Sequence, residues 1–195
     1  MNIIFVADIF GITPEFKQLC QQVMHELADI GSLESHLIGP YQNQAKQFNC
    51  EGDAYQYFMK NITLAGYAKT LTQSLSQITG DKLLVGFSVG GSAIWQLAAS
   101  GACKSYLGAI CFYSSQIRYM HELTPRIPTR VILPAAEQYF SVVELGKVLQ
   151  EKPTVIVEQS EGLHGFINQR SAHYHHGICQ YYIKRLARLL TNAIH

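Results

Sequence analysis

A serine hydroxyl that could act as a nucleophile lies in the sequence G-F-S-V-G at residues 86–90, with Ser88 at its centre. The apolar run 83–85 precedes this segment, and the helix-prone stretch 92–99 follows it. The arrangement is typical of a sharp strand-to-helix turn, in which small residues on both sides relieve the crowding of a strained backbone. It predicts an exposed Ser88 Oγ, with the amide of Val89 near the helix N-terminus as one donor to an oxyanion. Because G-x-S-x-G also occurs in ordinary glycine-rich turns, the interpretation depends on partners elsewhere in the chain.

A serine of this kind needs a base, and His164 is the candidate. It lies in the glycine-flanked sequence E-G-L-H-G-F at residues 161–166, after an expected strand, where the base should follow the nucleophile and the acid in chain order. The cluster at His173, His175 and His176 has no cysteine or carboxylate at metal-ligand spacing, so we expect an exposed approach to a helix and no metal site. The remaining histidines, His25, His36, His121 and His195, lie too early in the chain or at its end.

The acid of such a triad should lie on a loop between the nucleophile and the base. Glu137 occupies that position in P-A-A-E, directly after the apolar run 131–133. Its carboxylate could accept from the distal N–H of the base and hold the required tautomer. The rivals are Glu161, too close in sequence to His164, and Glu144, which we expect inside a helix.

A second oxyanion donor is expected where the first strand ends, in the sequence A-D-I-F-G-I-T-P at residues 7–14. The amide of Ile9 is the first candidate and that of Phe10 the second, with an ordinary glycine turn as the alternative. One such donor typically contributes about 3 kcal/mol to transition-state stabilisation.

Composition limits what else the chain could be. Its 195 residues are 48% hydrophobic and 15% charged with a net charge of +1, which predicts one compact domain over residues 1–195 and no nucleic-acid surface. Five cysteines without C-x-x-C spacing favour reduced thiols, and an N-terminus without a basic leader predicts a soluble cytoplasmic protein with no membrane span. A small-molecule ester suits this surface as a partner. The sequence does not indicate an oligomeric state.

Apolar segments alternate with amphipathic ones, which is typical of a parallel sheet flanked by helices. Six strands are expected at residues 3–7, 35–38, 82–86, 106–112, 131–133 and 154–157. Helices are expected from residues 13–14, over 62–78, over 92–99 and over 177–193. The polar stretch 39–53 is interpreted as a loop, long enough to serve as a lid.

Four segments together resemble the dienelactone hydrolase family of α/β-hydrolases. These are D-I-F-G-I-T-P from Asp8, the segment around Ser88, C-F-Y ending at Tyr113, and H-G-F ending at Phe166. The resemblance implies an α/β-hydrolase fold with a mostly parallel sheet of about six strands in the order 2-1-3-4-5-6, without the usual N-terminal hairpin. It also implies a hydrolase that needs no cofactor, and a substrate that contacts Asp8, Tyr113 and Phe166.

The chain differs from that family at functional positions. The name-giving enzymes use a cysteine where this chain has Ser88, and they have a glutamate where it has Asp8. Their arginine after H-G-F is replaced by Asn168, which argues against dienelactone itself as the substrate. We therefore expect a serine hydrolase acting on a small ester, lactone or thioester. The alternative is an inactive binding module with Glu137 turned away from His164, and a nucleotide binder is disfavoured because no G-x-G-x-x-G or P-loop is present.

Overall fold

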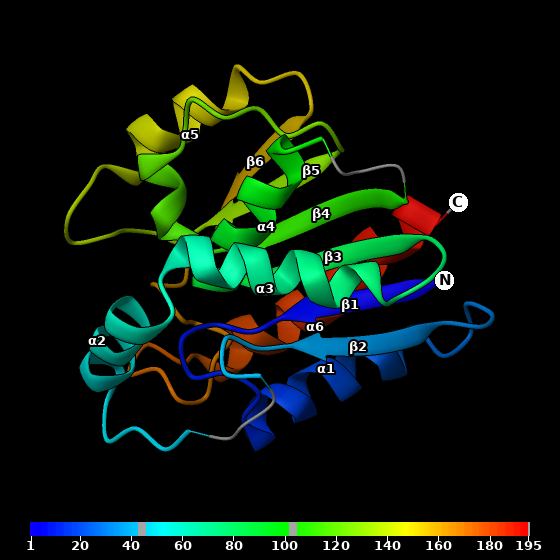
Figure 1. Cartoon of the computed structure of the whole chain (residues 1–195), viewed down its shortest axis with the longest axis horizontal. Coiled ribbons are helices and arrows are strands. Elements are labelled where there is room, and N and C mark those ends of the chain that lie inside the picture. The colour runs from blue at the N-terminus through cyan, green and yellow to red at the C-terminus, as the bar shows by residue number, and fades with distance from the viewer. Residues whose placement is uncertain (43–45, 102–104, 195) are drawn as a thin grey trace.

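Six parallel strands form one twisted sheet at the centre of the molecule (Figure 1). The computed structural model describes residues 1–42, 46–101 and 105–194. The strands pair in the order β2-β1-β3-β4-β5-β6, and every pair is parallel. Their bounds are β1 Asn2–Val6, β2 Glu34–Ile38, β3 Lys82–Phe87, β4 Tyr106–Phe112, β5 Thr129–Leu133 and β6 Val155–Gln159.

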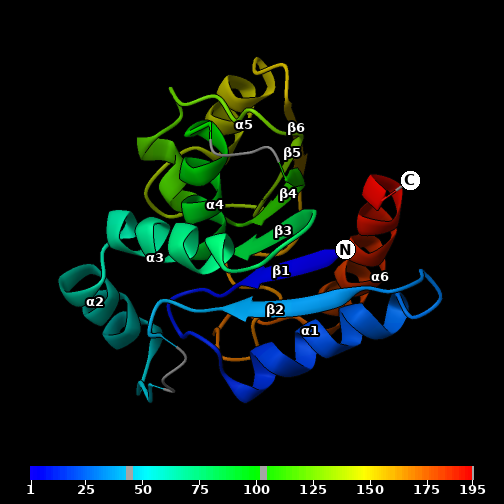
Figure 2. The same cartoon turned by 45° about the vertical axis from the view of Figure 1, so that its right-hand side comes forward.

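Helices cover both faces of this sheet. Figure 2 shows α3 and α4 on one side, with α1 and α6 on the other. The helical bounds are α1 Pro14–Glu26, α2 Glu51–Asn61, α3 Leu64–Ser76, α4 Val89–Ala99, α5 Val142–Gln150 and α6 His176–Ile194, with a 3-10 turn η1 at Ser115–Tyr119.

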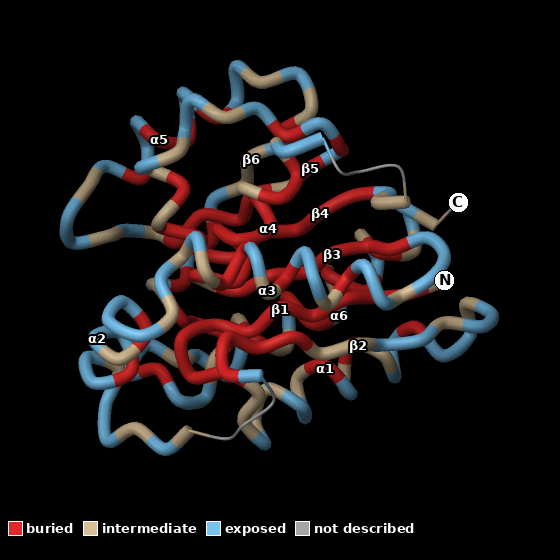
Figure 3. Tube along the Cα trace, in the orientation of Figure 1, coloured by how far each residue is buried: buried red, intermediate tan, exposed pale blue. Residues whose placement is uncertain are grey.

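Along each central strand, successive side chains pack alternately into two separate hydrophobic clusters, one on each face of the sheet. In β1, Ile4 and Val6 pack toward the side of α3 and α4, whereas Ile3 and Phe5 pack toward α1 and α6. All four side chains are fully buried. The red trace along the middle strands in Figure 3 marks this double-sided burial, which explains why these strands are apolar at nearly every position after the first.

The order and direction of the strands confirm the sequence-based prediction, and each expected strand is present within two residues at either end. Thr13 caps α1 as expected, because its Oγ1 accepts a hydrogen bond from the amide of Phe16 at 3.1 Å. The prediction for residues 39–53 needs correction, because α2 already begins at Glu51. Residues 43–45 of that stretch lie outside the described part.

Two further expectations concern thiols and membranes. Cys20, Cys50, Cys111 and Cys179 are free thiols, and Cys103 lies outside the described residues. Within the described ranges, no helix has the length and apolar character needed to cross a membrane.

Candidate active site

Ser88 occupies the turn between β3 and α4 in a strained conformation. Its φ is +52° and its ψ is −117°, values that L-residues rarely adopt. Its amide is fixed by a hydrogen bond to the carbonyl of Phe112 at 2.9 Å. The turn requires glycine at position 90, because a Cβ there would lie 2.4 Å from the carbonyl oxygens of Val6 and Ala7. The sequence pattern around Ser88 therefore corresponds to close backbone packing at the end of β1.

The structure brings Ser88, His164 and Glu137 together. Ser88 Oγ lies 2.9 Å from His164 Nε2, and Glu137 Oε1 lies 2.7 Å from His164 Nδ1. The imidazole is thus held between a hydroxyl on one nitrogen and a carboxylate on the other. The side chains of His164 and Glu137 are 23% and 14% exposed, so both are largely shielded from water yet open to a small molecule.

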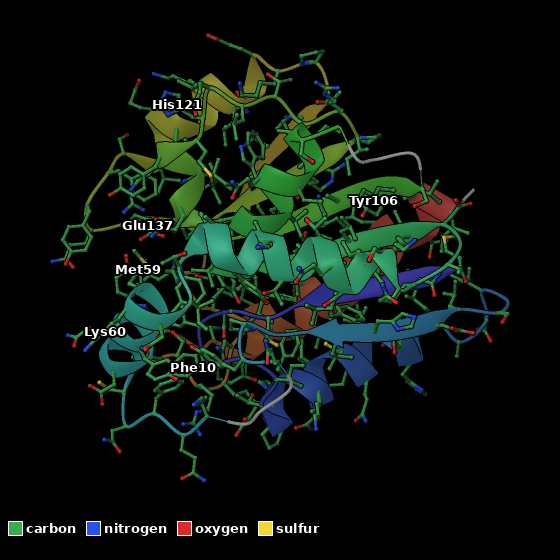
Figure 4. All side chains as sticks on the ribbon, viewed as in Figure 1. Phe10, Met59, Lys60, Tyr106, His121 and Glu137 are labelled. Atoms are coloured by element: carbon green, nitrogen blue, oxygen red, sulfur yellow. The ribbon has the colours of Figure 1, made fainter. Side chains whose placement is uncertain are left out.

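Backbone hydrogen bonds between neighbouring loops align the acid with the base. The amide of Ala135 donates to the carbonyl of Gly162 at 2.8 Å, and the amide of Ser160 donates to the carbonyl of Leu133 at 2.8 Å. The loop after β5 is therefore fixed against the loop after β6. Figure 4 shows Glu137 at the end of the sheet opposite Tyr106, which begins β4. The site lies at the carboxyl ends of the strands, as expected for a parallel sheet.

Glu137 is held in its ionised form by its neighbours. Burial alone would raise its pKa, but the hydrogen bond and charge of His164, the hydroxyl of Ser115 and the guanidinium of Arg118 together lower the pKa below its usual range. An ionised Glu137 can only accept hydrogen bonds, so the proton between it and His164 resides on Nδ1. Nε2 is then free to accept the hydroxyl proton of Ser88.

The two amides expected to bind an oxyanion belong to residues at the cavity. Among the described residues, no hydrogen bond uses the N–H of Val89 or of Ile9, and both residues line the cavity at Ser88. The amide of Phe10, the second candidate, is not available. It donates to Asp8 Oδ1 at 2.9 Å, because the carboxylate folds back onto its own turn.

Asp8 is a buried residue of the turn that follows β1. It is 7% exposed, and its Oδ2 accepts from Asn168 Nδ2 at 2.5 Å. Burial raises the pKa of Asp8 to about 6, although the bonds from Phe10 and Asn168 and the charge of His164 oppose the shift. Asp8 thus connects the turn that carries Ile9 to the loop that follows His164.

The structure does not place the expected substrate contacts at the cavity. Asp8, Tyr113 and Phe166 are all buried, and none of them lines the space in front of Ser88. Tyr113 instead packs its ring beneath His164, with the ring centroids 5.1 Å apart, and Phe166 packs against Tyr113 in turn. Both aromatic residues face inward because the strand and loop that carry them end in the core.

A cavity of about 820 Å³ opens in front of Ser88. Its walls come from the turn after β1, from α2, from η1 and from the loops after β5 and β6. The lining residues are Ile9, Glu51, Gly52, Tyr55, Ser88, Val89, Ser115, Gln116, Arg118, Ala136, Glu137, Gln138, Tyr139, Leu163, His164 and His173. The volume is within the usual range for a small-molecule site.

Sequence reasoning missed Ser115. Its Oγ donates a short hydrogen bond to Glu137 Oε1 and lies 3.0 Å from His164 Nδ1. The available signal was its position three residues beyond the end of β4, but serine is common in such turns and no motif marks it. Sequence reasoning also missed the wall formed by α2, to which Glu51 and Tyr55 contribute.

The rival residues take no part in the hydrogen bonds that link Ser88, His164 and Glu137. Glu144 is on α5, where it pairs with Lys147 at 2.9 Å, and Glu161 is exposed on its loop. His173 lines the cavity, and its Nδ1 lies 3.2 Å from the backbone carbonyl oxygen of His164, whereas His176 begins α6. Within the described part of the chain, no group of three or more potential ligands could hold a metal ion.

Comparisons with known proteins identify the type of fold. No family model matches the chain. The uncharacterized protein YczH of Bacillus subtilis is 27% identical over 179 residues, which cover 90% of this chain and 85% of that protein.

Solved structures are similar at lower identity. Dienelactone hydrolase from Anabaena variabilis has a TM-score of 0.69 and 12% identity, covering 98% of this chain and 85% of that one. The dienelactone hydrolase-like promiscuous phosphotriesterase P91 from metagenomic libraries gives 0.66 and 16%, with coverage of 98% and 86%. Est1E from Butyrivibrio proteoclasticus, solved with ferulic acid bound, gives 0.63 and 12%, with coverage of 99% and 89%. The chain therefore has the α/β-hydrolase fold, with dienelactone hydrolase-like enzymes among its structural neighbours.

Proposed function

We propose that this protein is a serine hydrolase that cleaves a small ester, lactone or thioester through an acyl-enzyme. One observation carries the proposal. Ser88 Oγ lies 2.9 Å from His164 Nε2, the other ring nitrogen of His164 lies 2.7 Å from Glu137, and the hydroxyl opens into a cavity that Val89 and Ile9 also line, whose amides have no partner among the described residues. Nucleophile, base, acid and oxyanion donors are the complete set that acyl transfer requires.

The first half-reaction forms the acyl-enzyme. Ser88 Oγ attacks the carbonyl carbon while its proton passes to Nε2 of His164, and Glu137 stabilises the resulting imidazolium. The carbonyl electron pair moves to oxygen, where the amides of Val89 and Ile9 donate to it. Collapse of the tetrahedral intermediate breaks the bond to the leaving alcohol or thiol, which takes the proton from Nε2.

The second half-reaction restores the enzyme. A water molecule gives its proton to Nε2 and attacks the acyl carbon, and collapse releases the acid and returns the proton to Ser88. The site needs no cofactor for either half-reaction. A serine nucleophile depends on its base more than a cysteine does, which makes the short distance between Ser88 and His164 a requirement of this mechanism.

Labelling with a fluorophosphonate tests the nucleophile directly. We expect the wild-type protein to be labelled at Ser88 and the Ser88→Ala variant to remain unlabelled. In turnover of p-nitrophenyl esters, Ser88→Ala or His164→Ala should each lower kcat by on the order of a million-fold, because the triad acts as a unit. A protein that is folded yet neither labelled nor active would instead be a binding module.

The substrate panel follows from the cavity and the neighbours. A volume of about 820 Å³ admits acyl groups from acetyl to aromatic ones. Because Est1E was solved with ferulic acid and P91 is named a phosphotriesterase, the panel should include a feruloyl ester and an aryl phosphotriester beside simple esters, lactones and thioesters.

A further inference from the structure

We propose that Ser115 is a positioning residue of this site, which orients the carboxylate of Glu137 and the proton of His164 through its single hydroxyl. The inference rests on the proposed function. Ser115 Oγ hydrogen-bonds to Glu137 Oε1 and lies 3.0 Å from His164 Nδ1, so one oxygen touches both partners of the base and acid pair. The residue is 9% exposed, which keeps competing water away from this contact.

Counting protons fixes the direction of every bond in the cluster. An ionised Glu137 only accepts, and the other acceptor of Ser115 Oγ, the carbonyl oxygen of Tyr113, lies farther away at 3.4 Å, so the one proton of Ser115 points toward Oε1. The lone pairs of Ser115 Oγ then face Nδ1 of His164, which carries a proton and donates it to Oε1 at 2.7 Å, with Oγ as a second acceptor. The Nδ1–H tautomer therefore has two acceptors, whereas the opposite tautomer would place the Nδ1 lone pair against the carboxylate of Glu137.

The backbone around Ser115 is fixed by its neighbours. Its amide donates to the carbonyl of Tyr113 at 2.9 Å, and its own carbonyl accepts from Arg118 Nη1 at 2.8 Å. The guanidinium of Arg118 lies 4.3 Å from the ring centroid of Tyr119 and 4.9 Å from that of Phe140. These contacts fix the backbone position from which the hydroxyl of Ser115 reaches Glu137.

Ser115 also connects three loops that are far apart in the sequence. Ser115 follows β4, Glu137 follows β5 and His164 follows β6. The contacts between Ser115 and these two side chains span 22 and 49 residues of sequence. In support, the hydroxyl of Ser115 is among the groups that lower the pKa of Glu137.

The same geometry argues against Ser115 as the nucleophile. Its Oγ faces Nδ1, which already holds the proton shared with Glu137 and has no lone pair to accept another. Ser88 faces Nε2, where the lone pair is free. Covalent labelling should therefore appear on Ser88 alone, although Ser115 also lines the cavity.

Steady-state kinetics of four proteins test the role. Ser115→Ala should lower kcat about ten- to a hundredfold with KM nearly unchanged, the range expected for losing a hydrogen bond to a charged group. The fall of activity on the acid side should also shift to higher pH, because Glu137 loses one donor. Ser115→Thr, which keeps the hydroxyl, should restore both values. Ser114→Ala is the matched control, since the neighbouring hydroxyl bonds to the carbonyl of Phe112 and, among the described residues, to neither Glu137 nor His164.

A double-mutant cycle separates this role from general disruption. In a Glu137→Gln background, Ser115→Ala should cost less than twofold, because the residue acts through a carboxylate that is already gone. Equal losses in both backgrounds would overturn the proposal, as would a wild-type pH profile in Ser115→Ala. If Ser115→Ala does not fold, Ser115→Cys keeps the volume with a much weaker donor and should show the same kinetic defect.

A spectroscopic measurement keeps this inference distinct from the proposed function. The Nδ1 proton of His164 should give a downfield proton resonance that moves in Ser115→Ala and stays in place in Ser114→Ala. If no ester is hydrolysed but the resonance responds in this way, the proposed function fails and the positioning role stands. If esters are hydrolysed and the resonance is unchanged in Ser115→Ala, the positioning role fails alone.

Discussion

Ser88 combines backbone strain with a polar side chain that has one well-placed partner. Its positive φ is costly for a residue with a Cβ, and the surrounding hydrogen bonds maintain it. The strain directs Oγ away from the sheet and toward His164 Nε2. The strained backbone of Ser88 therefore holds Oγ in the position that the proposed attack requires.

Replacing Glu137 tests the acid at the residue scale. In Glu137→Gln the amide nitrogen can donate to Nδ1, which favours the tautomer with the proton on Nε2 and leaves Ser88 without a base. We expect kcat for an activated ester to fall about ten-thousand-fold, as for a triad whose acid becomes an amide. The measurement is steady-state hydrolysis at pH 7 to 8.

Glu161→Gln is the matched control, because it removes the same charge from the exposed rival on the loop of His164. It should hydrolyse the ester at the wild-type rate. Similar losses in the two variants would show that the charge of the loop matters and that the contact with His164 does not.

The residues of the site differ in how far the sequence could predict them. Ser88, Glu137 and His164 each follow a strand in a fixed chain order, so topology alone narrows the choice. Ser115 has no such signal, because its role depends on where Glu137 comes to lie. The inward orientation of Tyr113 could not be predicted either, since a strand end can point its side chain to the core or to the cavity.

The turn from β3 into α4 is the element on which the site depends most. α4 begins so close to the end of β1 that there is no room for a side chain at position 90. We expect Gly90→Ala to destabilise the protein by about 3 kcal/mol or more, because the obstacle is backbone and cannot rotate away. For a chain of this length the melting temperature should fall by roughly 6–12 °C.

Gly52→Ala provides the comparison within a helix. A Cβ at Gly52 would meet only the sulfur of Cys50, at 3.7 Å, so the methyl group fits without displacing anything. This variant should match the wild type or gain about 0.5–1 kcal/mol from the better helix former. Thermal denaturation of both variants decides the matter, and a wild-type melting temperature for Gly90→Ala would contradict the packing described.

The helix α2 was not predicted from the sequence. Only Ala54 and Phe58 of this helix are buried, so its apolar signal is weak. It begins at a Cys50 cap whose sulfur accepts from the amide of Asp53 at 3.5 Å, a residue type that rarely marks a helix start. The central strands, by contrast, are buried on both faces and are visible in the sequence as nearly continuous apolar runs.

At the scale of the whole molecule, Asp8 makes stability depend on pH in an unusual direction. Its pKa of about 6 in the folded protein exceeds its ordinary value of 3.8, so the folded state binds the proton more tightly than the unfolded state. Stability contributed by this group is therefore greatest below pH 4 and declines as the pH rises to about 6, by roughly 3 kcal/mol.

Urea denaturation between pH 4 and pH 7 measures this effect. The difference in unfolding free energy between wild type and Asp8→Asn should change by about 2.4 kcal/mol across this range, because the variant cannot ionise and the unfolded wild type is already partly ionised at pH 4. Asp29→Asn, at an exposed position after α1, should leave the pH dependence as in the wild type. A difference that does not vary with pH would mean that Asp8 is already ionised at pH 4.

The position of His164 beyond β6 has a consequence for how the protein is made. Ser88 and His164 are 76 residues apart, and the base reaches its place only after the edge strand of the sheet has paired with β5. At usual rates of translation these 76 residues take roughly 4–15 s to add. During that interval the growing chain carries a serine without a base. The pair of Ser88 and His164 is thus completed only after β6 and the loop that follows it have been synthesised.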